Sequence, residues 1–217
     1  IHIPFCKQAC TYCNFHFSTS LKQKEAFINA LQKEIKSFQV EEKDPLPIET
    51  IYLGGGTPSI LTIEEINKIF AALKHRFIIS ADAEITLEAN PDDISKEKLM
   101  LWKETGINRL SIGLQSFDEA ELKWMNRAHN SAEAYQTLAL VKEAGFTNYS
   151  LDLIYGSNLQ TNEILKHNLE TLTNADVPHI SAYALTVEPK TALQHFIKAN
   201  KEEPINTDKQ AEQYQIV

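Results

Sequence analysis

The feature that most constrains the fold is a regular alternation of short apolar segments with helical ones. Six runs rich in β-branched or aromatic residues are typical of strands, and they cover residues 1–5, 50–55, 83–89, 107–114, 147–156 and 179–187. Between them, apolar residues at helical spacing predict helices over 20–39, 62–77, 95–105, 131–144 and 161–174. Strands that alternate with helices indicate βα units and a parallel sheet.

Several helix ends carry their own signals. Thr62 opens a capping-box pattern, and Ser95 and Ser131 stand where an N-cap is expected. Gly106 and Gly145 follow two of the helices, where glycine commonly ends a helix in the left-handed conformation. These signals support the same division of the chain into βα units.

Polar or glycine residues near the ends of the predicted strands favour a barrel over a doubly wound sheet. They are Cys6, Gly54 to Thr57, Glu88, Gln115, Asp152 and Thr186. A βα barrel gathers such groups in one ring at the mouth formed by the carboxyl ends of its strands. A closed barrel needs eight strands and only six are counted, so we expect a partial, laterally open (β/α)6 TIM-type barrel.

We expect this barrel to cover residues 1–190. Residues 191–217 are polar, then begin a helix-like pattern that stops without a cap. They read as the start of a truncated C-terminal region. The chain also begins without Met and without a basic leader, so we expect no signal peptide and a natural start further upstream.

The overall charge and hydrophobicity exclude some classes of function. The formal net charge is −8, which argues against a nucleic-acid partner because such proteins need a basic face. No run of 18 apolar residues occurs, so no transmembrane segment is expected.

All three cysteines of the chain, Cys6, Cys10 and Cys13, lie within eight residues. An odd number excludes a complete disulfide framework. The clustering points to metal or redox chemistry in a reducing compartment, and we expect the cytosol.

Three kinds of cysteine site are compatible with the spacing alone. An iron–sulfur cluster of four irons would be held at three corners and would leave one iron open. A tetrahedral zinc ion would need a fourth ligand, for which His2 or His16 is available. Three buried cysteines acting as small hydrophobes fit less well, because polar residues such as Lys7 flank them. The iron–sulfur cluster is the favoured interpretation.

The CxxxCxxC spacing after a first strand, with Tyr12 before the third cysteine, resembles the radical S-adenosylmethionine (SAM) enzymes. Further motifs follow in the order of the oxygen-independent coproporphyrinogen III oxidase superfamily: IHIPFC, YLGGGTPS, LEANP, NRLSIGLQSF, NRAH, LDLIYG and AYALTVEP. The resemblance implies that the three cysteines hold a [4Fe–4S] cluster whose open iron binds SAM. It also implies cleavage of SAM to a 5′-deoxyadenosyl radical, with electrons from a reduced flavodoxin or ferredoxin type of donor.

The same resemblance assigns SAM contacts to nine residues of this chain: Tyr12, Gly55, Gly56, Thr57, Glu88, Gln115, Arg127, Asp152 and Thr186. The GGGT stretch would contact the amino group of SAM, Glu88 the ribose hydroxyls and Arg127 the carboxylate. Tyr12 and Thr186 would lie near adenine. Asp152, an acid among apolar residues, is expected to bond either the ligand or Arg127.

One position separates two branches of this superfamily. The coproporphyrinogen-oxidising branch carries a further cysteine two residues after the third, where this chain has Phe15. The CxYCxF form and NRAH are similar to the HemW branch, which is implicated in binding haem and delivering it to recipient proteins. The HNxxY-type haem motif of that branch is absent, since residues 129–133 read HNSAE and residues 167–171 read HNLET.

Three hypotheses about function remain open. The first is a HemW-like haem chaperone with a radical SAM core, for which haem or porphyrin and a haem-recipient protein would be partners. The second is a true radical SAM enzyme acting on a porphyrinogen or an unidentified substrate, although the missing cysteine puts coproporphyrinogen oxidation in doubt. The third is a zinc-stabilised binding protein.

Overall fold

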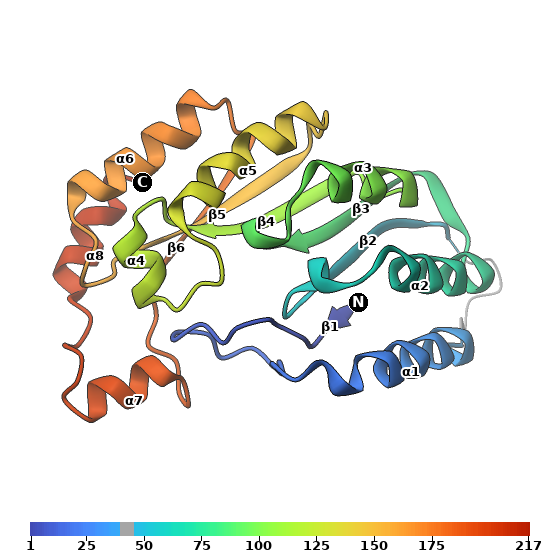
Figure 1. The fold of residues 1–217 in the computed structure, drawn as a ribbon, viewed down its shortest axis with the longest axis horizontal. Coiled ribbons are helices and arrows are strands. Elements are labelled where there is room, and N and C mark those ends of the chain that lie inside the picture. Colours follow the sequence, from blue (N-terminus) through green and yellow to red (C-terminus); the bar gives the residue numbers. More distant parts are fainter. Residues whose placement is uncertain (40–45) are drawn as a thin grey trace.

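Six parallel strands form one curved sheet (Figure 1). The structure is a computed structural model that describes residues 1–39 and 46–217. Its strands are β1 (His2–Ile3), β2 (Ile48–Gly55), β3 (Ile79–Ala89), β4 (Arg109–Gln115), β5 (Tyr149–Tyr155) and β6 (His179–Ala184). Each strand pairs with the next one in the sequence, and within the described residues β1 and β6 do not pair with each other. The predicted partial (β/α)6 barrel, open on one side, is confirmed.

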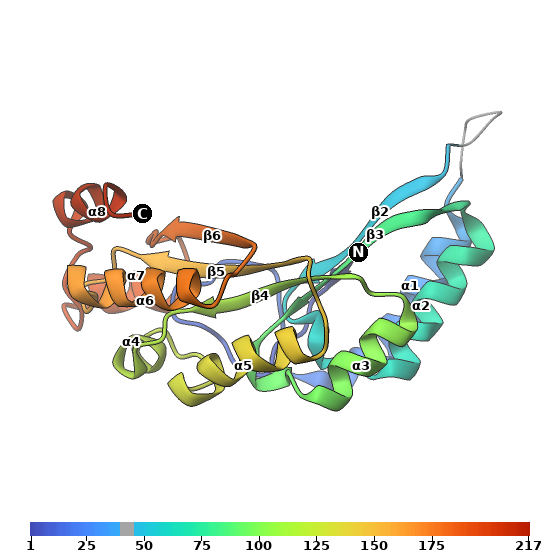
Figure 2. The same ribbon diagram turned by 90° about the horizontal axis from the view of Figure 1, so that it is seen from above.

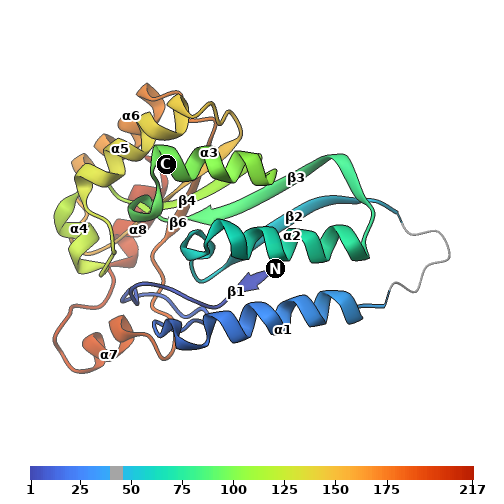
Figure 3. The same ribbon diagram turned by 45° about the vertical axis from the view of Figure 1, so that its right-hand side comes forward.

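The helices connect successive strands, and α2, α3 and α5 cover the same face of the sheet (Figure 2). Their bounds are α1 (Lys24–Ser37), α2 (Ile63–Arg76), α3 (Lys96–Thr105), α4 (Glu119–Trp124), α5 (Ser131–Glu143), α6 (Asn162–Asn174), α7 (Ala192–Lys198) and α8 (Thr207–Tyr214). Short 3-10 helices cover Leu21–Gln23, Pro58–Ile60 and Pro91–Asp93. The ion pair between Lys24 and Glu65 joins α1 to α2, which lie side by side (Figures 1 and 3). No helix among the described residues is long and apolar enough to cross a membrane.

Strand β4 shows how one strand serves both the core and the barrel interior. Leu110, Ile112 and Leu114 are fully buried in the main hydrophobic core or beside it. Successive side chains of a strand point to opposite faces, so the residues between these three, Ser111 and Gly113, face the inside of the barrel. The sheet therefore has an apolar outer face that holds the helices and a polar inner face that is free for a site.

Several elements differ from those predicted. Strand β1 contains only two residues, since Pro4 has no amide hydrogen to continue the ladder. Helix α5 is capped by Asn130 rather than Ser131. Helices α4 and α7 were not predicted, because neither is long enough to show helical periodicity.

Two residues expected at strand ends lie further inside their strands. Asp152 is in the middle of β5, and Glu88 is the second-last residue of β3. The prediction counted them among the groups near the strand ends, although Asp152 lay in the middle of the predicted run 147–156 as it does in β5. Both side chains nevertheless face the barrel interior, and their distance from the rim places them on the floor of the site described below.

Gly56, just after β2, lies directly against the backbone of the segment that begins with β1. A Cβ atom added at Gly56 would lie 2.7 Å from the Phe5 carbonyl oxygen and 2.9 Å from the Ile3 carbonyl oxygen. The amide of Gly56 donates to that Ile3 oxygen at 2.8 Å. This glycine therefore allows β1, which leads into the cysteine segment, to approach the sheet.

We predict that Gly56→Ala lowers the free energy of unfolding by about 1–3 kcal/mol, because backbone atoms of β1 must move away. Gly113→Ala is the matched control within the sheet, since a Cβ there would meet only the ends of the Gln115, Arg127 and Asn90 side chains. Urea unfolding curves measure both. Equal losses of stability in the two variants would contradict the close approach of β1.

Candidate functional site

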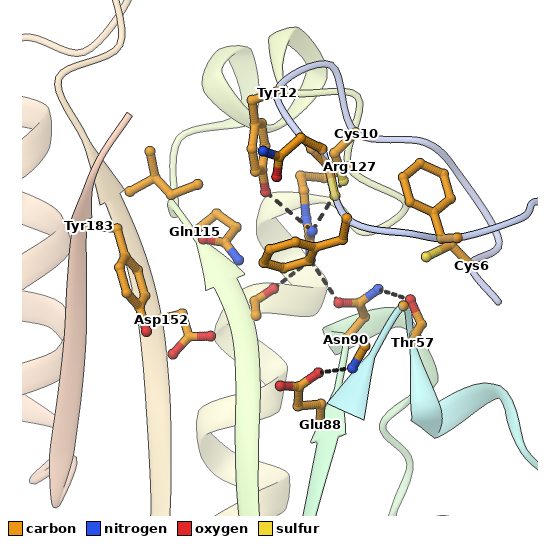
Figure 4. A pocket seen from close by; sticks show the side chains of 18 of the residues that line it. Cys6, Cys10, Tyr12, Thr57, Glu88, Asn90, Gln115, Arg127, Asp152 and Tyr183 are labelled. Atoms are coloured by element: carbon orange, nitrogen blue, oxygen red, sulfur yellow. Dashed lines mark hydrogen bonds between the residues drawn. The ribbon is translucent and has the colours of Figure 1, made fainter. Parts of the chain in front are cut away.

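One cavity at the carboxyl end of the barrel collects every predicted site residue. It has a volume of about 500 Å³ and is partly open. Its lining includes the three cysteines together with Tyr12, Gly55, Gly56, Thr57, Glu88, Gln115, Arg127, Asp152 and Thr186. Figure 4 shows how several of these side chains converge from different strands. Their assigned roles stay predictions, but their common location is a property of the fold.

The cysteines lie on the segment that follows β1. Cys6, Cys10 and Cys13 are free and partly exposed at the cavity wall. The amide of Cys13 donates to the carbonyl of Cys10 at 3.3 Å, so these two residues belong to one tight turn. Burial raises the pKa of the Cys6 and Cys13 thiols, so metal binding at these residues would release their protons.

The end of α4 holds this cysteine segment in place. Asn126, directly after the helix, has a positive φ of 55° and reverses the chain direction. Its side-chain amide donates to the Ala9 carbonyl at 2.7 Å, and Gln8 donates to the Asn126 side-chain oxygen at 2.8 Å. The amide of Thr11 donates to the Met125 carbonyl at 3.0 Å. The left-handed turn thus fixes the cysteine segment and directs the next residue, Arg127, into the cavity.

Arg127 joins three parts of the site (Figure 4). Its Nη1 lies 3.3 Å from Cys10 Sγ, and its Nη2 donates to Asn90 Oδ1 at 2.8 Å and to the Gly113 carbonyl at 2.6 Å. Its Nε is buried without a partner. Burial disfavours the charge, but Tyr12 and Cys10 beside the guanidinium raise the pKa of Arg127 above its usual range. A fixed positive charge therefore lines the cavity next to the cysteines.

No acidic residue neutralises Arg127 directly. Among the described residues, its guanidinium forms no ion pair with an Asp or Glu side chain. The sequence left two partners open for Asp152, a ligand or Arg127, and the structure shows no direct bond between Asp152 and Arg127. The guanidinium instead uses neutral oxygens and a sulfur.

The GGGT stretch uses all four of its amides within the protein. Gly54 donates to the Ile1 carbonyl, Gly56 to the Ile3 carbonyl and Thr57 to the Phe5 carbonyl, at 2.7–3.0 Å. The amide of Gly55 donates to Glu88 Oε2 at 3.0 Å. Gly55 itself has a φ of 116°, and its backbone lies against the ring of His2. The backbone amides of the stretch are therefore not available to a ligand.

Glu88 lies at the floor of the cavity with part of its bonding capacity unused. Its Oε1 accepts from the hydroxyl of Tyr52 at 2.8 Å, and its Oε2 accepts from the Gly55 amide. Burial and the Glu88 carboxylate raise the pKa of Tyr52 to about 12, so this hydroxyl stays a donor. A carboxylate has about four lone-pair sites, and the two that remain suit donors of a ligand.

Gln115 ends β4 in a strained conformation that turns its side chain to the cavity. Its φ is 71°, and the register between β4 and β5 shifts between Gly113 and Gln115. Such bulges often re-aim a side chain near a functional site. The Oε1 atom of Gln115 is buried without a hydrogen-bond partner, so it is available to accept from a ligand.

Several residues of the cavity were not predicted from the sequence, among them Tyr52, Asn90, Ser111 and Gly113. Asn90 lies in the LEANP motif and bonds Arg127, but a polar residue after a strand usually only caps a turn. The signal that could have found Gly113 is a glycine inside a strand, which often marks a close approach. The backbone of Gly113 does contact Arg127.

The two histidines considered as fourth zinc ligands do not line the cavity. A ring nitrogen of His2 lies 3.0 Å from the carbonyl oxygen of His16. The described residues contain no group of three His, Cys, Asp or Glu side chains arranged around a single ion. A four-iron cluster is larger than one ion, so its cysteine ligands need not converge on one point.

Comparison with known proteins adds the family. The Radical SAM superfamily matches residues 1–172. The protein named heme chaperone HemW in Bacillus subtilis is 36% identical over 219 residues, covering 100% of this chain and 58% of the relative. HemW of Escherichia coli is 36% identical over 198 residues, covering 88% and 51%. The chain thus spans little more than half the length of these relatives.

A solved structure supports the same placement. Coproporphyrinogen III oxidase (HemN) from Escherichia coli, described as a radical SAM enzyme, matches with a TM-score of 0.76 and 27% identity. The match covers 92% of this chain and 51% of that one. The chain therefore belongs to the radical SAM superfamily, and its sequence is HemW-like.

Proposed function

We propose that this chain forms the radical SAM core of a haem-handling protein, with a [4Fe–4S] cluster on Cys6, Cys10 and Cys13 and SAM beside it. The observation that carries the proposal is the half-buried guanidinium of Arg127 in the cavity wall. It lies 3.3 Å from Cys10 Sγ and pairs with no acidic side chain in the described part of the chain. A buried charge without a counter-ion is costly, so the cavity favours an anionic ligand group here.

The remaining wall of the cavity matches the other groups of SAM. The GGGT stretch has its amides occupied, so a ligand ammonium group would donate to lone pairs that remain on its carbonyl oxygens, each of which has two. Glu88 keeps lone pairs for two hydroxyls, as on a ribose. The unpartnered oxygen of Gln115 accepts one further donor. The cavity thus offers a site for a carboxylate, a site for an ammonium group and a site for a ribose diol. SAM carries all three groups, because it is an amino acid joined to a nucleoside.

Each part of the protein then has a distinct task. When bound and reduced, the cluster supplies the electron that cleaves the sulfonium of SAM. The cysteines hold the cluster, Arg127 orients the carboxylate of SAM, and Glu88 orients its ribose. The floor of the cavity is formed by side chains from β2 to β5, which exclude bulk water from below.

Haem is the cargo that the comparisons favour. The relatives at 36% identity are named heme chaperones, and Phe15 stands where the oxidising branch carries a cysteine. We propose haem or porphyrin as ligand and a haem-recipient protein as partner for the protein to which this chain belongs. A flavodoxin- or ferredoxin-type donor in a reducing, cytoplasmic setting would supply electrons.

A second candidate is a radical SAM enzyme with a substrate of its own. It is favoured by one observation, that all nine predicted SAM contacts line the same cavity as the cysteines. The two candidates are separated by product analysis. Transfer of haem to an apo-protein without a new small-molecule product supports the chaperone, whereas a substrate-derived product supports the enzyme.

We predict that anaerobic reconstitution with iron and sulfide yields a reduced protein with a [4Fe–4S]⁺ EPR signal that shifts on addition of SAM. Replacing Cys6, Cys10 or Cys13 individually by alanine is expected to abolish the shift, because each thiolate holds one iron. Iron and sulfide analysis accompanies the spectra. Uptake of zinc without sulfide, and no response to SAM, would overturn the proposal in favour of a zinc site.

We predict that Arg127→Lys weakens SAM binding about 10- to 100-fold, because lysine cannot bond a carboxylate bidentately. Equilibrium dialysis with labelled SAM, normalised to bound iron, measures the dissociation constant. Arg76→Lys is the matched control, since Arg76 lies in the last turn of α2 and does not line the cavity. Unchanged binding in Arg127→Lys would remove the carboxylate role from this residue.

Asp152, which lines the same cavity, lowers the stability of the folded protein when its carboxyl group is ionised. Burial is the main cause that raises the pKa of Asp152 to about 6. The Ser181 hydroxyl opposes the rise, Glu88 adds to it, and Arg127 and Arg109 oppose it. Since the folded-state pKa lies above the ordinary value of 3.8, the folded protein loses stability as the pH rises from about 4 to above 6.

We predict that Asp152→Asn raises the free energy of unfolding of the ligand-free protein by about 2 kcal/mol at pH 8 and hardly changes it at pH 4. Urea unfolding at the two pH values measures the difference. Asp82→Asn, at an exposed position of β3, is the control and is expected to show no such pH-dependent gain. A gain of equal size at both pH values would show that ionisation is not the cause.

A further inference from the structure

The cysteine segment has a second support that lies outside the matched family region. Residues 185–198, here called the clasp, follow β6 and include α7, whereas the family match ends at residue 172. The clasp contacts the segment between Cys10 and Asn14 at its backbone, at a side chain and through a small core. Leu193 makes the backbone contact and belongs to the small core, whereas the side-chain contact is made by Glu188.

Thr11 forms hydrogen bonds with both supports of the cysteine segment, the end of α4 and the clasp. Its amide donates to the Met125 carbonyl after α4 at 3.0 Å, and its hydroxyl donates to the Trp124 carbonyl at 3.3 Å. Its carbonyl accepts from the amide of Leu193 in α7 at 2.8 Å. Leu193 is in the first turn of α7, where a helix amide has no partner within the helix. The clasp therefore completes the hydrogen bonding of a residue between two cysteines.

A small core separate from the main one packs beneath the same segment. Its buried members are Met125, Ile154, Leu185 and Leu193, and Tyr12, Trp124, Val187, Ile197 and Ile205 pack against them. Leu193 is 1% exposed. Tyr12 in turn places its hydroxyl 3.5 Å from Arg127 Nη1. The small core that contains Leu193 thus packs against the tyrosine that touches the guanidinium.

A hydrogen bond at the surface also joins the clasp to the cysteine segment. The side-chain amide of Asn14 donates to Glu188 Oε2 at 3.2 Å. Asn14 follows Cys13 directly, and Glu188 also lines the cavity. The backbone bond, the small core and this bond together span the cysteine segment from Thr11 to Asn14.

We propose that the clasp is a positioning element for the cluster site and that Leu193 is its principal positioning residue. Without the clasp, Thr11 and Tyr12 keep their bonds to the end of α4 and to Arg127, and the segment is otherwise anchored near its ends, at Lys7 and at His16 to Ser18. The role of the clasp in cluster and SAM binding rests on the proposed function. Its role in ordering the cysteine segment does not. Ordering of residues 6–18 in the metal-free chain is a separate and measurable property.

The test uses the full chain with Leu193→Ala and, as matched control, Leu172→Ala. Leu172 is 0% exposed in α6 and belongs to the main core. Both variants lose an equally buried helical leucine, so a general loss of stability affects both. Hydrogen–deuterium exchange of peptides from residues 6–18 is measured in the metal-free proteins under conditions where both stay folded.

We expect exchange in residues 6–18 to be about 10-fold faster in Leu193→Ala than in the original chain and unchanged in Leu172→Ala, because only the clasp contacts are lost locally. Unchanged exchange in Leu193→Ala, or an equal increase in both variants, overturns the proposal. If Leu193→Ala does not fold, Glu188→Ala provides the second variant, for which we expect about a 2- to 3-fold increase in the same peptides and for which no increase overturns the proposal.

A second readout follows in the reconstituted proteins. At equal iron content, Leu193→Ala is expected to show a weaker SAM-dependent shift of the EPR signal, whereas Leu172→Ala keeps the shift of the original chain. A full shift in Leu193→Ala counts against the positioning role. If the original chain itself binds no cluster, the proposed function fails, and the exchange measurement still decides whether the clasp orders the cysteine segment.

Discussion

The arrangement of this site depends on one half-buried cation in the cavity wall. The guanidinium of Arg127 contacts the cysteine segment through Cys10, the β3 loop through Asn90 and the inner face of β4 through Gly113. A lysine would supply the charge but not the planar set of donors that reaches three directions at once. Because the positive charge has no acidic partner among the described residues, it also leaves the site suited to an anionic ligand.

The parallel sheet provides the setting in which this cation can act. Its outer face is apolar and holds the helices, so the inner face carries polar groups without weakening the core. The carboxyl ends of the strands then bring together residues that lie far apart in the sequence. Some groups in the cavity reduce stability instead of adding to it, as the raised pKa of Asp152 shows. Such unfavourable groups are typical of sites that are completed by a ligand.

Much of the fold and of the site was predictable from local sequence patterns. The features that were missed were missed for physical reasons. Six strands and the long helices follow from periodicity, and the cysteines and the GGGT stretch follow from their spacing. Arg127 was found only through its NRAH motif, because α4, which positions it, is too short to show a period. Asn90 was missed because its role arises from a contact across the barrel. The support of Thr11 by Leu193 was not predictable, since nothing in either local sequence points to the other.

That long-range contact has a consequence for the order in which the protein becomes competent during synthesis. The cysteines leave the ribosome before the residues that support them, which lie at 122–127 and 185–198. Contacts of such sequence separation form late, after the intervening loops have closed. The nascent thiols therefore remain unsupported while the residues between them and the clasp are made. Stable loading with iron is thus expected to follow translation of the clasp, even though every proposed cysteine ligand is made well before it.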